Sequence, residues 1–269
     1  MRATVGREGA FALKVFPPHR SGSIASVVAL TRELRFIGIP TPETSADFHA
    51  HGIRFPWIDG PTMKQRLEQA EPGRSLQDLP SMAGHLGAAM KILRELHGAD
   101  ISRHDLTNFK PFRHIDWRLG HSNLINQPPL FQSNAMELRA ILKARMPELT
   151  GRSVIHGDFH VGQLIQDRTS KKWWLIDLDD VARGCPEADV ANFCVHLATS
   201  RTIVSEGVRT AYPAIMAIAV DAYGKSLDSD LLKIFAALTF LRRALKKAEH
   251  GDASAWTTTL LAAGCDLVS

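Results

Sequence analysis

The sequence has few cysteines, only Cys185, Cys194 and Cys265 among 269 residues. An odd number at no metal-ligand spacing argues against the disulfide framework of a secreted protein and favours a reducing compartment. Long hydrophobic runs are also missing. The N-terminal MRATVGREG lacks the apolar segment of a signal peptide, and the most apolar window, Tyr212 to Val220, is about half as long as a bilayer span. We therefore expect a cytoplasmic protein that does not bind a membrane.

A strong charge of one sign is absent as well. The 32 basic residues exceed the 28 acidic ones by only four, and most are interspersed with acids. The one dense basic cluster is LRRALKKAEH near the C-terminus. On a helix these cations are expected to spread around a solvated face, so we expect no nucleic-acid partner. The positive balance also does not favour a polycationic substrate. The sequence gives no indication of the oligomeric state.

The apolar and charged fractions are those of an ordinary globular protein, and 269 residues can bury a sizeable core. No internal repeat or low-complexity tract is present. The patterns predict an α+β protein with a β-rich first quarter and a mainly helical remainder. The boundary between the two falls near Ile58 to Pro61, so we expect a bilobal chain with parts 1–60 and 61–269.

The first quarter predicts strands around one helix. RATV and AFALKVF flank GREG, whose glycines, Gly6 and Gly9, suit a tight hairpin turn. Apolar residues then recur at helical spacing from Ile24 to Ile37, and Gly38 is a plausible stop. The next segment has too many helix breakers for a helix, so we expect two strands there, the second being IRFPWI.

The remainder predicts helices interrupted by one hairpin. Apolar residues recur at helical spacing from Leu79 to Leu96 and predict a helix there. The stretch from Ile101 to Pro129 gives no clear assignment. LIQDRTSKKWWLI predicts a hairpin between buried strands. Further helices are expected over 134–146, from about Ala188, over 213–223 and over 229–250.

The stretch SVIHGDFHVGQLI places many polar groups between two short apolar runs. Asp158 lies in a tight turn after a buried strand, Gln163 precedes the next strand, and Asp177 ends the second arm of the hairpin. Because a hairpin brings its ends together, Gln163 and Asp177 should lie side by side, with Asp158 on the loop leading in. Hard oxygen ligands of this kind suit Mg²⁺, which takes one or two carboxylates together with substrate phosphates.

Phosphoryl transfer needs such an arrangement, because a metal must bridge the phosphates while a carboxylate orients the attacking hydroxyl. In protein kinases the catalytic Asp and the metal-binding Asn are five positions apart, and a second metal-binding Asp follows. The order here is Asp158, Gln163, Asp177. HGDFHVGQLI, LIDLDD and PEADVANF together resemble the aminoglycoside phosphotransferase / choline kinase-like family, which has a protein kinase-like fold. The match is residue by residue from Val154 to Asn192, and weaker features extend it over most of the chain.

The resemblance implies ATP, or another nucleoside triphosphate, with Mg²⁺ as cofactors and a small hydroxyl-bearing molecule as phosphate acceptor. It implies that Lys14 contacts the phosphates and pairs with Glu33, and that backbone in FPWIDGPT faces the adenine. The residues that it assigns are Asp158 as catalytic base, Gln163 and Asp177 as metal ligands, Lys14, Glu33, Pro56, Trp57 and Ile58 for the nucleotide, and His156, His160, Asp180 and Asp189 as supporting residues.

Two departures from the family pattern bear on activity. Gln163 stands where the family usually has Asn and is one methylene longer, although the maltokinase branch is similar in carrying H-G-D-x-H-x-G-Q. In addition, only about a dozen residues precede Lys14. We therefore expect the first strand and the phosphate-covering loop of the family to be missing, through either a late start codon or a truncated small lobe. Their loss should weaken ATP binding without removing the base or the metal site.

Other interpretations of the same residues stay open at this point. His156, Asp158 and His160, with His196 as a further ligand, could form a zinc or iron site of a hydrolase. Asp189 could cap a helix, and Asp179 could be a local loop anchor. The function predicted first is ATP- and Mg²⁺-dependent O-phosphotransfer to a small molecule. The alternative is a weak or inactive kinase-fold protein that binds nucleotide or has a regulatory role.

Overall fold

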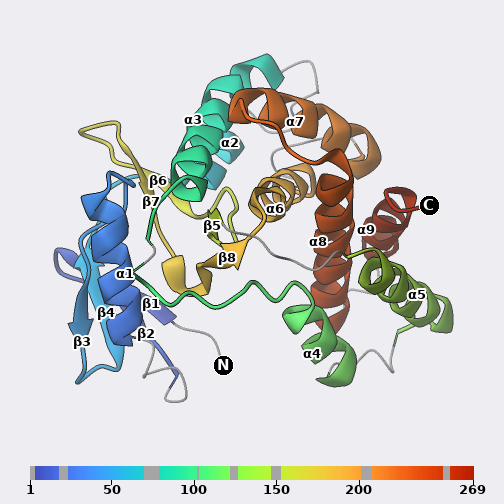
Figure 1. The fold of residues 1–269 in the computed structure, drawn as a ribbon, viewed down its shortest axis with the longest axis horizontal. Coiled ribbons are helices and arrows are strands. Elements are labelled where there is room, and N and C mark those ends of the chain that lie inside the picture. The colour runs from blue at the N-terminus through green and yellow to red at the C-terminus, as the bar shows by residue number, and fades with distance from the viewer. Residues whose placement is uncertain are drawn as a thin grey trace.

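The computed structural model describes residues 4–17, 24–69, 79–101, 103–121, 127–146, 153–200, 207–250 and 255–269. Within these ranges a small β-rich part is followed by a mainly helical part (Figure 1). The predicted α+β class is therefore confirmed. Residues 2 and 3 of the predicted first strand lie outside the described ranges. No described helix is both long enough and apolar enough to cross a membrane.

The small part is an antiparallel sheet of four strands in the order β1-β2-β4-β3, with one helix beside it. The elements are β1 (Thr4–Glu8), β2 (Phe11–Val15), α1 (Ile24–Phe36), β3 (Ser45–Asp47) and β4 (Gly52–Pro56). The β1–β2 hairpin is confirmed, but its turn is at Gly9 and Ala10, and Gly6 is a strand residue paired with Leu13. A two-residue turn needs a positive φ, which Gly9 supplies at +61°.

The alternation of side chains along β2 determines the face of the sheet on which the Lys14 side chain lies. Along β2, Ala12 and Lys14 are buried while Phe11 and Val15 are exposed, as a period of two requires. The buried face of the sheet packs on α1 through Phe16, Ile24, Val28 and Ile53, which form a small separate core. Lys14 thus lies on the covered face of a central strand.

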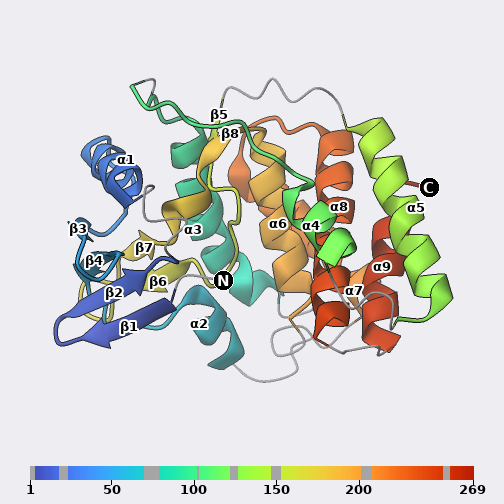
Figure 2. The ribbon, with the colours of Figure 1, turned by 90° about the horizontal axis from the view of Figure 1, so that it is seen from below.

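The segment between the two parts is hydrogen-bonded to an embedded hairpin of β6 (Leu164–Gln166) and β7 (Trp173–Leu175). Backbone N–H groups of Gln166 and Leu175 donate to the carbonyls of Pro61 and Pro40, at 3.0 and 2.7 Å. Figure 2 shows this hairpin between the small sheet and the helices. Because these hydrogen bonds connect the hairpin to both parts of the chain, the two ends of the hairpin lie where the small sheet meets the helical part.

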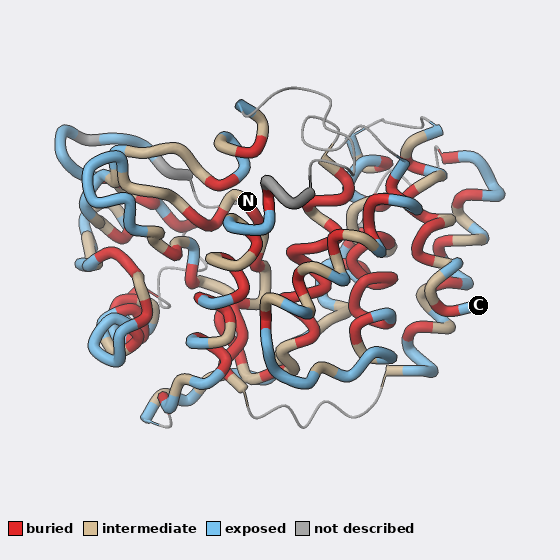
Figure 3. Tube along the Cα trace, turned by 90° about the horizontal axis from the view of Figure 1, so that it is seen from above, coloured by how far each residue is buried: buried red, intermediate tan, exposed pale blue. Residues whose placement is uncertain are grey.

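The helical part is built around α6, a helix that is buried along nearly all of its length. The α6 helix packs against α7, α8 and β5, and Figure 3 shows buried residues concentrated where these elements meet. The remaining elements are α2 (Met63–Gln69), α3 (Leu79–His97), α4 (Arg113–His121), α5 (Pro129–Arg145), β5 (Ser153–Ile155), the 3-10 turn η4 (Leu178–Asp180), β8 (Ala182–Gly184), α6 (Pro186–Ala198), α7 (Val208–Tyr223), α8 (Ser229–Glu249) and α9 (Ala255–Asp266).

Some boundaries differ from the prediction. The α5 helix begins at Pro129, five residues before the predicted start, and α6 begins at Pro186 rather than near Ala188. Proline is well suited to the first turn of a helix, where its missing N–H would have no partner. The unassigned stretch from Ile101 to Pro129 contains α4, and β8 was not predicted.

Candidate functional site

The loop after β5 is held by one buried carboxylate. Asp189 accepts the backbone N–H groups of His156 and Gly157 at 2.6 and 3.0 Å, and it also contacts Nε2 of His97 at 3.1 Å. The other ring nitrogen of His97 contacts the hydroxyl of Tyr223 at 2.9 Å. Asp189 lies within the first turn of α6, and the N-cap position is occupied by Cys185, so the helix-cap interpretation is wrong. It bonds instead to the backbone that precedes Asp158.

His156 connects the same loop to the end of β7. Its Nε2 lies 3.0 Å from the carbonyl oxygen of Ile176, so the ring donates its proton there. Gly157 has a φ of +82°, and a Cβ at this position would overlap the backbone carbonyl of Asp180. The loop and the η4 turn therefore approach each other too closely for any residue other than glycine.

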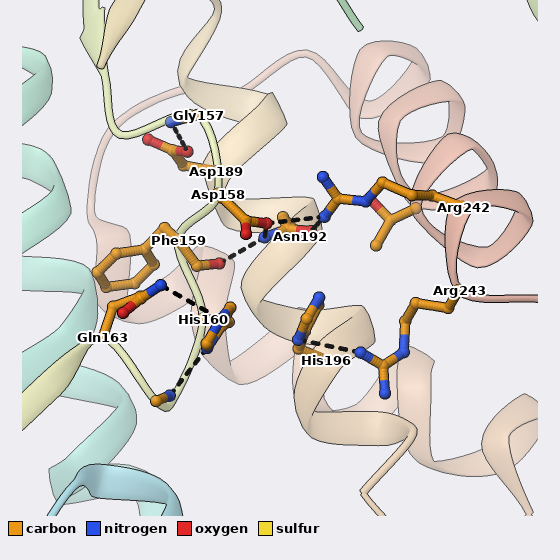
Figure 4. A network of polar contacts seen from close by, with 12 residues as sticks. Gly157, Asp158, Phe159, His160, Gln163, Asp189, Asn192, His196, Arg242 and Arg243 are labelled. Atoms are coloured by element: carbon orange, nitrogen blue, oxygen red, sulfur yellow. Dashed lines mark hydrogen bonds and ion pairs between the residues drawn. The ribbon is translucent and has the colours of Figure 1, made fainter. Parts of the chain in front are cut away.

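Asp158 follows Gly157, and its side chain is 41% exposed. Its Oδ1 accepts hydrogen bonds from Arg242 at 3.0 Å and from Asn192 at 3.4 Å (Figure 4). The same Arg242 nitrogen donates to Oδ1 of Asn192, whose amide nitrogen donates to the carbonyl of Phe159 at 2.7 Å. Burial alone would raise the pKa of Asp158, but the guanidinium of Arg242 holds it below its usual value. Asp158 is therefore an ionised carboxylate at neutral pH.

Lys14, Gln163 and Asp177 meet although they are far apart in the sequence. Lys14 pairs with Oδ1 of Asp177, and the amide nitrogen of Gln163 lies 2.8 Å from Oδ2 of Asp177. Lys14 also pairs with Asp179 at 2.7 Å. Burial opposes both charges, yet the two carboxylates raise the pKa of Lys14 and Lys14 lowers that of Asp177. The predicted proximity of Gln163 and Asp177 is confirmed.

Asp177 is one of three non-glycine residues with a positive φ in the described part of the chain, at 68°. The left-handed conformation costs an L-residue free energy and is found where the surroundings enforce it, often at functional sites. Here it turns the chain from β7 into η4, so that Asp177 and Asp179 both reach Lys14.

Glu33 does not pair with Lys14, so this expectation is wrong. Its carboxylate contacts Nε2 of His104 at 2.7 Å, and the partners of Lys14 are the two aspartates. The helical periodicity of α1 was predicted correctly, but the side-chain partner depends on where the segment around His104 passes the helix. A role for Glu33 in nucleotide binding stays a prediction.

The segment expected to face adenine begins at Pro56, the last residue of β4. Pro56 has no N–H, and the N–H of Trp57 donates to the carbonyl of Ala10 at 2.8 Å. The Trp57 ring is 40% exposed, with the guanidinium of Arg7 4.9 Å from its centre. Among the described residues, the N–H of Ile58 contacts no acceptor. If this segment binds a base, Ile58 is the residue that can donate to it.

His160 lies beside Gln163 in a fixed tautomer. Its Nδ1 accepts the N–H of Gly162 at 3.0 Å, and burial lowers the pKa of the ring to about 4. The ring is therefore neutral at pH 7 and carries its proton on Nε2, which lies 3.3 Å from the amide of Gln163. The ring stacks in parallel on His196, with centres 4.7 Å apart, and His196 accepts from Arg243.

Gln163 and Asp177 fit a magnesium ion. Nitrogen and oxygen of an amide are assigned from their contacts, and a 180° turn would replace Nε2 by Oε1. The oxygen would then lie 2.8 Å from Oδ2 of Asp177. This is close to the separation of about 2.9 Å between adjacent ligands of Mg²⁺, whose bonds are about 2.0–2.1 Å. The protonated Nε2 of His160 would donate to the turned amide, so the surroundings favour that orientation once a cation is bound.

The alternative zinc or iron site does not form from the residues proposed for it. His156 contacts the carbonyl of Ile176, His160 accepts from Gly162, and His196 accepts from Arg243. These rings point at other partners rather than at one centre. Within the described part of the chain, no three His, Cys, Asp or Glu side chains are arranged to hold a metal.

Two residues of the site, Asn192 and Arg242, were missed by the sequence interpretation, and Asp179 was interpreted as a local loop anchor although it pairs with Lys14. Asn192 follows Asp189 by three positions in α6, and that helical spacing could have indicated a shared face. Arg242 belongs to the basic cluster predicted to be solvated, but its side chain is only 16% exposed because α8 packs against α6. Lys247 of the same cluster is exposed, as predicted. Asp180, by contrast, was predicted and lies against Gly157 through its backbone.

Residues 2–246 match the sequence profile of a family described as the phosphotransferase enzyme family. No curated protein sequence matches the chain.

Solved structures with the same protein kinase-like fold include three whose names differ in substrate. A choline/ethanolamine kinase family protein from Mesorhizobium loti is 18% identical with a TM-score of 0.62, and the alignment covers 99% of this chain and 85% of that one. An aminoglycoside phosphotransferase from Streptomyces rimosus, in complex with ADP and streptomycin, is 18% identical with a TM-score of 0.56 and coverage of 87% of each chain. A glucosamine kinase is 16% identical with a TM-score of 0.59 and coverage of 97% and 81%. At these identities the likeness shows the fold.

Proposed function

Because this chain belongs to the phosphotransferase enzyme family, we propose that it transfers the γ-phosphate of ATP, or of another nucleoside triphosphate, to a hydroxyl group of a small molecule. The observation that supports this most directly is the contact of Lys14, Gln163 and Asp177. These residues come from the small sheet, from the loop that carries Asp158, and from the turn after β7. A cation, an amide and a carboxylate at one point are the groups that a metal–nucleotide complex needs.

Asp158 is the proposed base. Its carboxylate is ionised and partly exposed, so it can accept a hydrogen bond from the acceptor hydroxyl and orient the oxygen toward the γ-phosphorus. As the new O–P bond forms and the bond to the nucleoside diphosphate breaks, the hydroxyl proton passes to Asp158. Asp189 and His156 keep the loop in place, because they bind the backbone and the strand end on either side of it.

Lys14 is the proposed contact of the nucleotide phosphates. Its raised pKa keeps it charged at neutral pH, and its pairs with Asp177 and Asp179 hold it at the junction. Asp177 and Gln163 would hold Mg²⁺, which neutralises charge on the phosphates when it is bound. The Ile58 N–H is the proposed donor to the base of the nucleotide.

The test is a screen of small hydroxylated acceptors with labelled ATP, combined with thermal unfolding in the presence of MgATP. We expect MgATP at millimolar concentration to raise the melting temperature of the wild type, because ligand binding to the native state stabilises it. Asp158→Asn should keep this stabilisation and lose phosphoryl transfer by about 10²–10⁴-fold, the usual contribution of a positioned base.

The matched control is Asp230→Asn, since Asp230 is an exposed aspartate in the first turn of α8. It should change neither nucleotide binding nor transfer. Stabilisation by MgATP without transfer to any acceptor would favour the non-catalytic alternative. A folded wild type that does not respond to nucleotide at millimolar concentration would overturn the proposal.

A further inference from the structure

A pocket of about 430 Å³ is lined by Gly157, the residue before Asp158, and extends toward α8. Its other walls come from residues 107–111, 113 and 114, from η4 and the residues after it, and from the facing sides of α6 and α8. Arg242 and Asn192 line it, and both donate to the carboxylate of Asp158. This inference rests on the proposed function: because the residues that bind the carboxylate of Asp158 line the pocket, we take it as the site of the acceptor.

Arg242 reaches Asp158 with only part of its hydrogen-bonding capacity. Both of its contacts, to Asp158 and to Asn192, use the same terminal nitrogen, Nη2 (Figure 4). A guanidinium has five N–H donors in a planar fork. Those on Nη1 and Nε contact no acceptor within the described part of the chain. They are available to a molecule in the pocket.

The charged side chains around the pocket are predominantly basic. Lys110 and Arg113 line it together with Arg242, against Asp179 and Asp180. The lining therefore carries three cations and two carboxylates, and one of these carboxylates, Asp179, is paired with Lys14. His114, also in the wall, adds no charge at neutral pH, because burial and the neighbouring arginines lower its pKa.

Such a pocket discriminates by charge. An ammonium group would meet Arg113 and Arg242 and would have to compete with Arg242 for Asp158. A carboxylate or phosphate would instead accept from the unused donors of Arg242, in the bidentate geometry that guanidinium groups favour. We propose that the phosphate acceptor is a small hydroxylated molecule bearing an anionic group, and that Arg242 binds this group and selects the acceptor.

Binding of the anion has a second consequence for Asp158. In the structure Arg242 donates to the carboxylate that must accept the hydroxyl proton. A carboxylate whose neighbouring guanidinium also binds a second anion experiences less positive charge and is a stronger base, and catalysis by a base follows its basicity. An anionic acceptor bound to the unused donors of Arg242 therefore raises the basicity of Asp158, while Nη2 keeps its hydrogen bond to the carboxylate.

The experiment measures binding of four probes built on one sugar ring: D-glucose, D-glucosamine, D-glucuronate and D-glucose 6-phosphate. Calorimetric titrations of the intact protein with each, at fixed ionic strength and with a non-hydrolysable MgATP analogue present, separate neutral, cationic, carboxylate and phosphate chemistry. We expect at least one anionic probe to bind about tenfold more tightly than glucose, as charge-assisted hydrogen bonds predict, and glucosamine to bind most weakly.

Variants locate the effect. Arg242→Gln should abolish the preference for anions while binding of the nucleotide analogue is retained, and Arg113→Gln, at an exposed position, should reduce it in a protein whose core is untouched. Lys247→Gln, an exposed cation of α8 that does not line the pocket, should preserve it. Tighter binding of glucosamine, an unchanged preference in Arg242→Gln, or no binding of either anion at millimolar concentration would overturn the inference.

The nucleotide titration in the same samples keeps the two proposals apart. If the analogue binds but anions are not preferred, the inference on the acceptor fails and the proposed phosphotransfer stands. If the analogue does not bind at all, the proposed function fails whatever the sugars do.

Discussion

At the scale of single residues, Gly157 is the position where the loop tolerates least change. A side chain there would suffer the strain of a positive φ and would also overlap the carbonyl of Asp180. We expect Gly157→Ala to lower the free energy of unfolding by about 2–4 kcal/mol, measured by urea denaturation. Gly38→Ala is the matched control, because Gly38 has a φ of +96° but open space around it. A loss as small as that of the control, about 1 kcal/mol, would mean that the loop can move away from η4.

Gln163 allows a test of ligand length. Its amide reaches Asp177 from its present backbone position, so the extra methylene is accommodated. Gln163→Asn should therefore shorten the reach and weaken binding of Mn²⁺, used as a probe for Mg²⁺, by about tenfold in titrations followed by electron paramagnetic resonance. The control is Gln166→Asn, a change at a half-buried residue of the same hairpin whose side chain donates to the carbonyl of Lys171. Equal or tighter metal binding in Gln163→Asn would show that Gln163 is not a ligand.

The residues of the candidate site also show which contacts a sequence can predict and which it cannot. Asp158, Gln163 and Asp177 could be grouped because a strand, a loop and a hairpin place them locally. Arg242 could not, because it comes from a helix 84 residues away and reaches Asp158 only through the packing of α8 on α6. The partner of Glu33 was predicted wrongly for the same reason.

At the scale of elements, α8 depends on its first turn. Asp228 caps the helix by accepting the N–H groups of Asp230 and Leu231 at 2.8 and 3.0 Å, and its own N–H donates to the buried Glu187. Asp228→Ala should lower the free energy of unfolding by about 1 kcal/mol. Asp230→Ala, which removes only an exposed pair with Lys233, should change it by no more than about 0.5 kcal/mol, as chemical denaturation of both variants would reveal. Equal effects would assign the stabilisation to charge rather than to capping.

Elements with clear periodicity and clear breakers were predictable, and those defined by tertiary contacts were not. The range of α8 differs from the prediction by a single residue, since an apolar stripe and a capping aspartate bound it. By contrast β8 has only three residues and exists because it pairs with β5 across the site. The α4 helix carries few apolar residues, so its pattern alone does not separate it from a loop.

At the scale of the whole molecule, the pairs of Lys14 with Asp177 and Asp179 join the small sheet to the helical part. Burial opposes both charges, but these pairs raise the pKa of Lys14 above 10.5, and Lys14 lowers that of Asp177 below 3.8. A basic group whose pKa is higher in the folded protein stabilises the fold at pH values below its unfolded-state pKa, and this contribution is lost as the pH rises through its folded-state pKa. An acidic group whose pKa is lower in the folded protein stabilises the fold at pH values above its unfolded-state pKa, and this contribution is lost as the pH falls through its folded-state pKa.

The pairs should therefore stabilise the protein throughout the neutral range and stop doing so at both extremes. We expect Lys14→Met, without nucleotide and in a metal chelator, to melt at a lower temperature than the wild type by a constant amount from about pH 5 to 9. The difference should shrink below pH 3.8, where Asp177 begins to be protonated, and above pH 10.5, where Lys14 begins to lose its proton. Scanning calorimetry of both proteins across this range measures it, with Lys233→Met, which removes an exposed pair, as the control. A difference that persists unchanged in acid would attribute the effect of the substitution to packing of the Lys14 side chain, because an ion pair cannot outlast the protonation of its carboxylates.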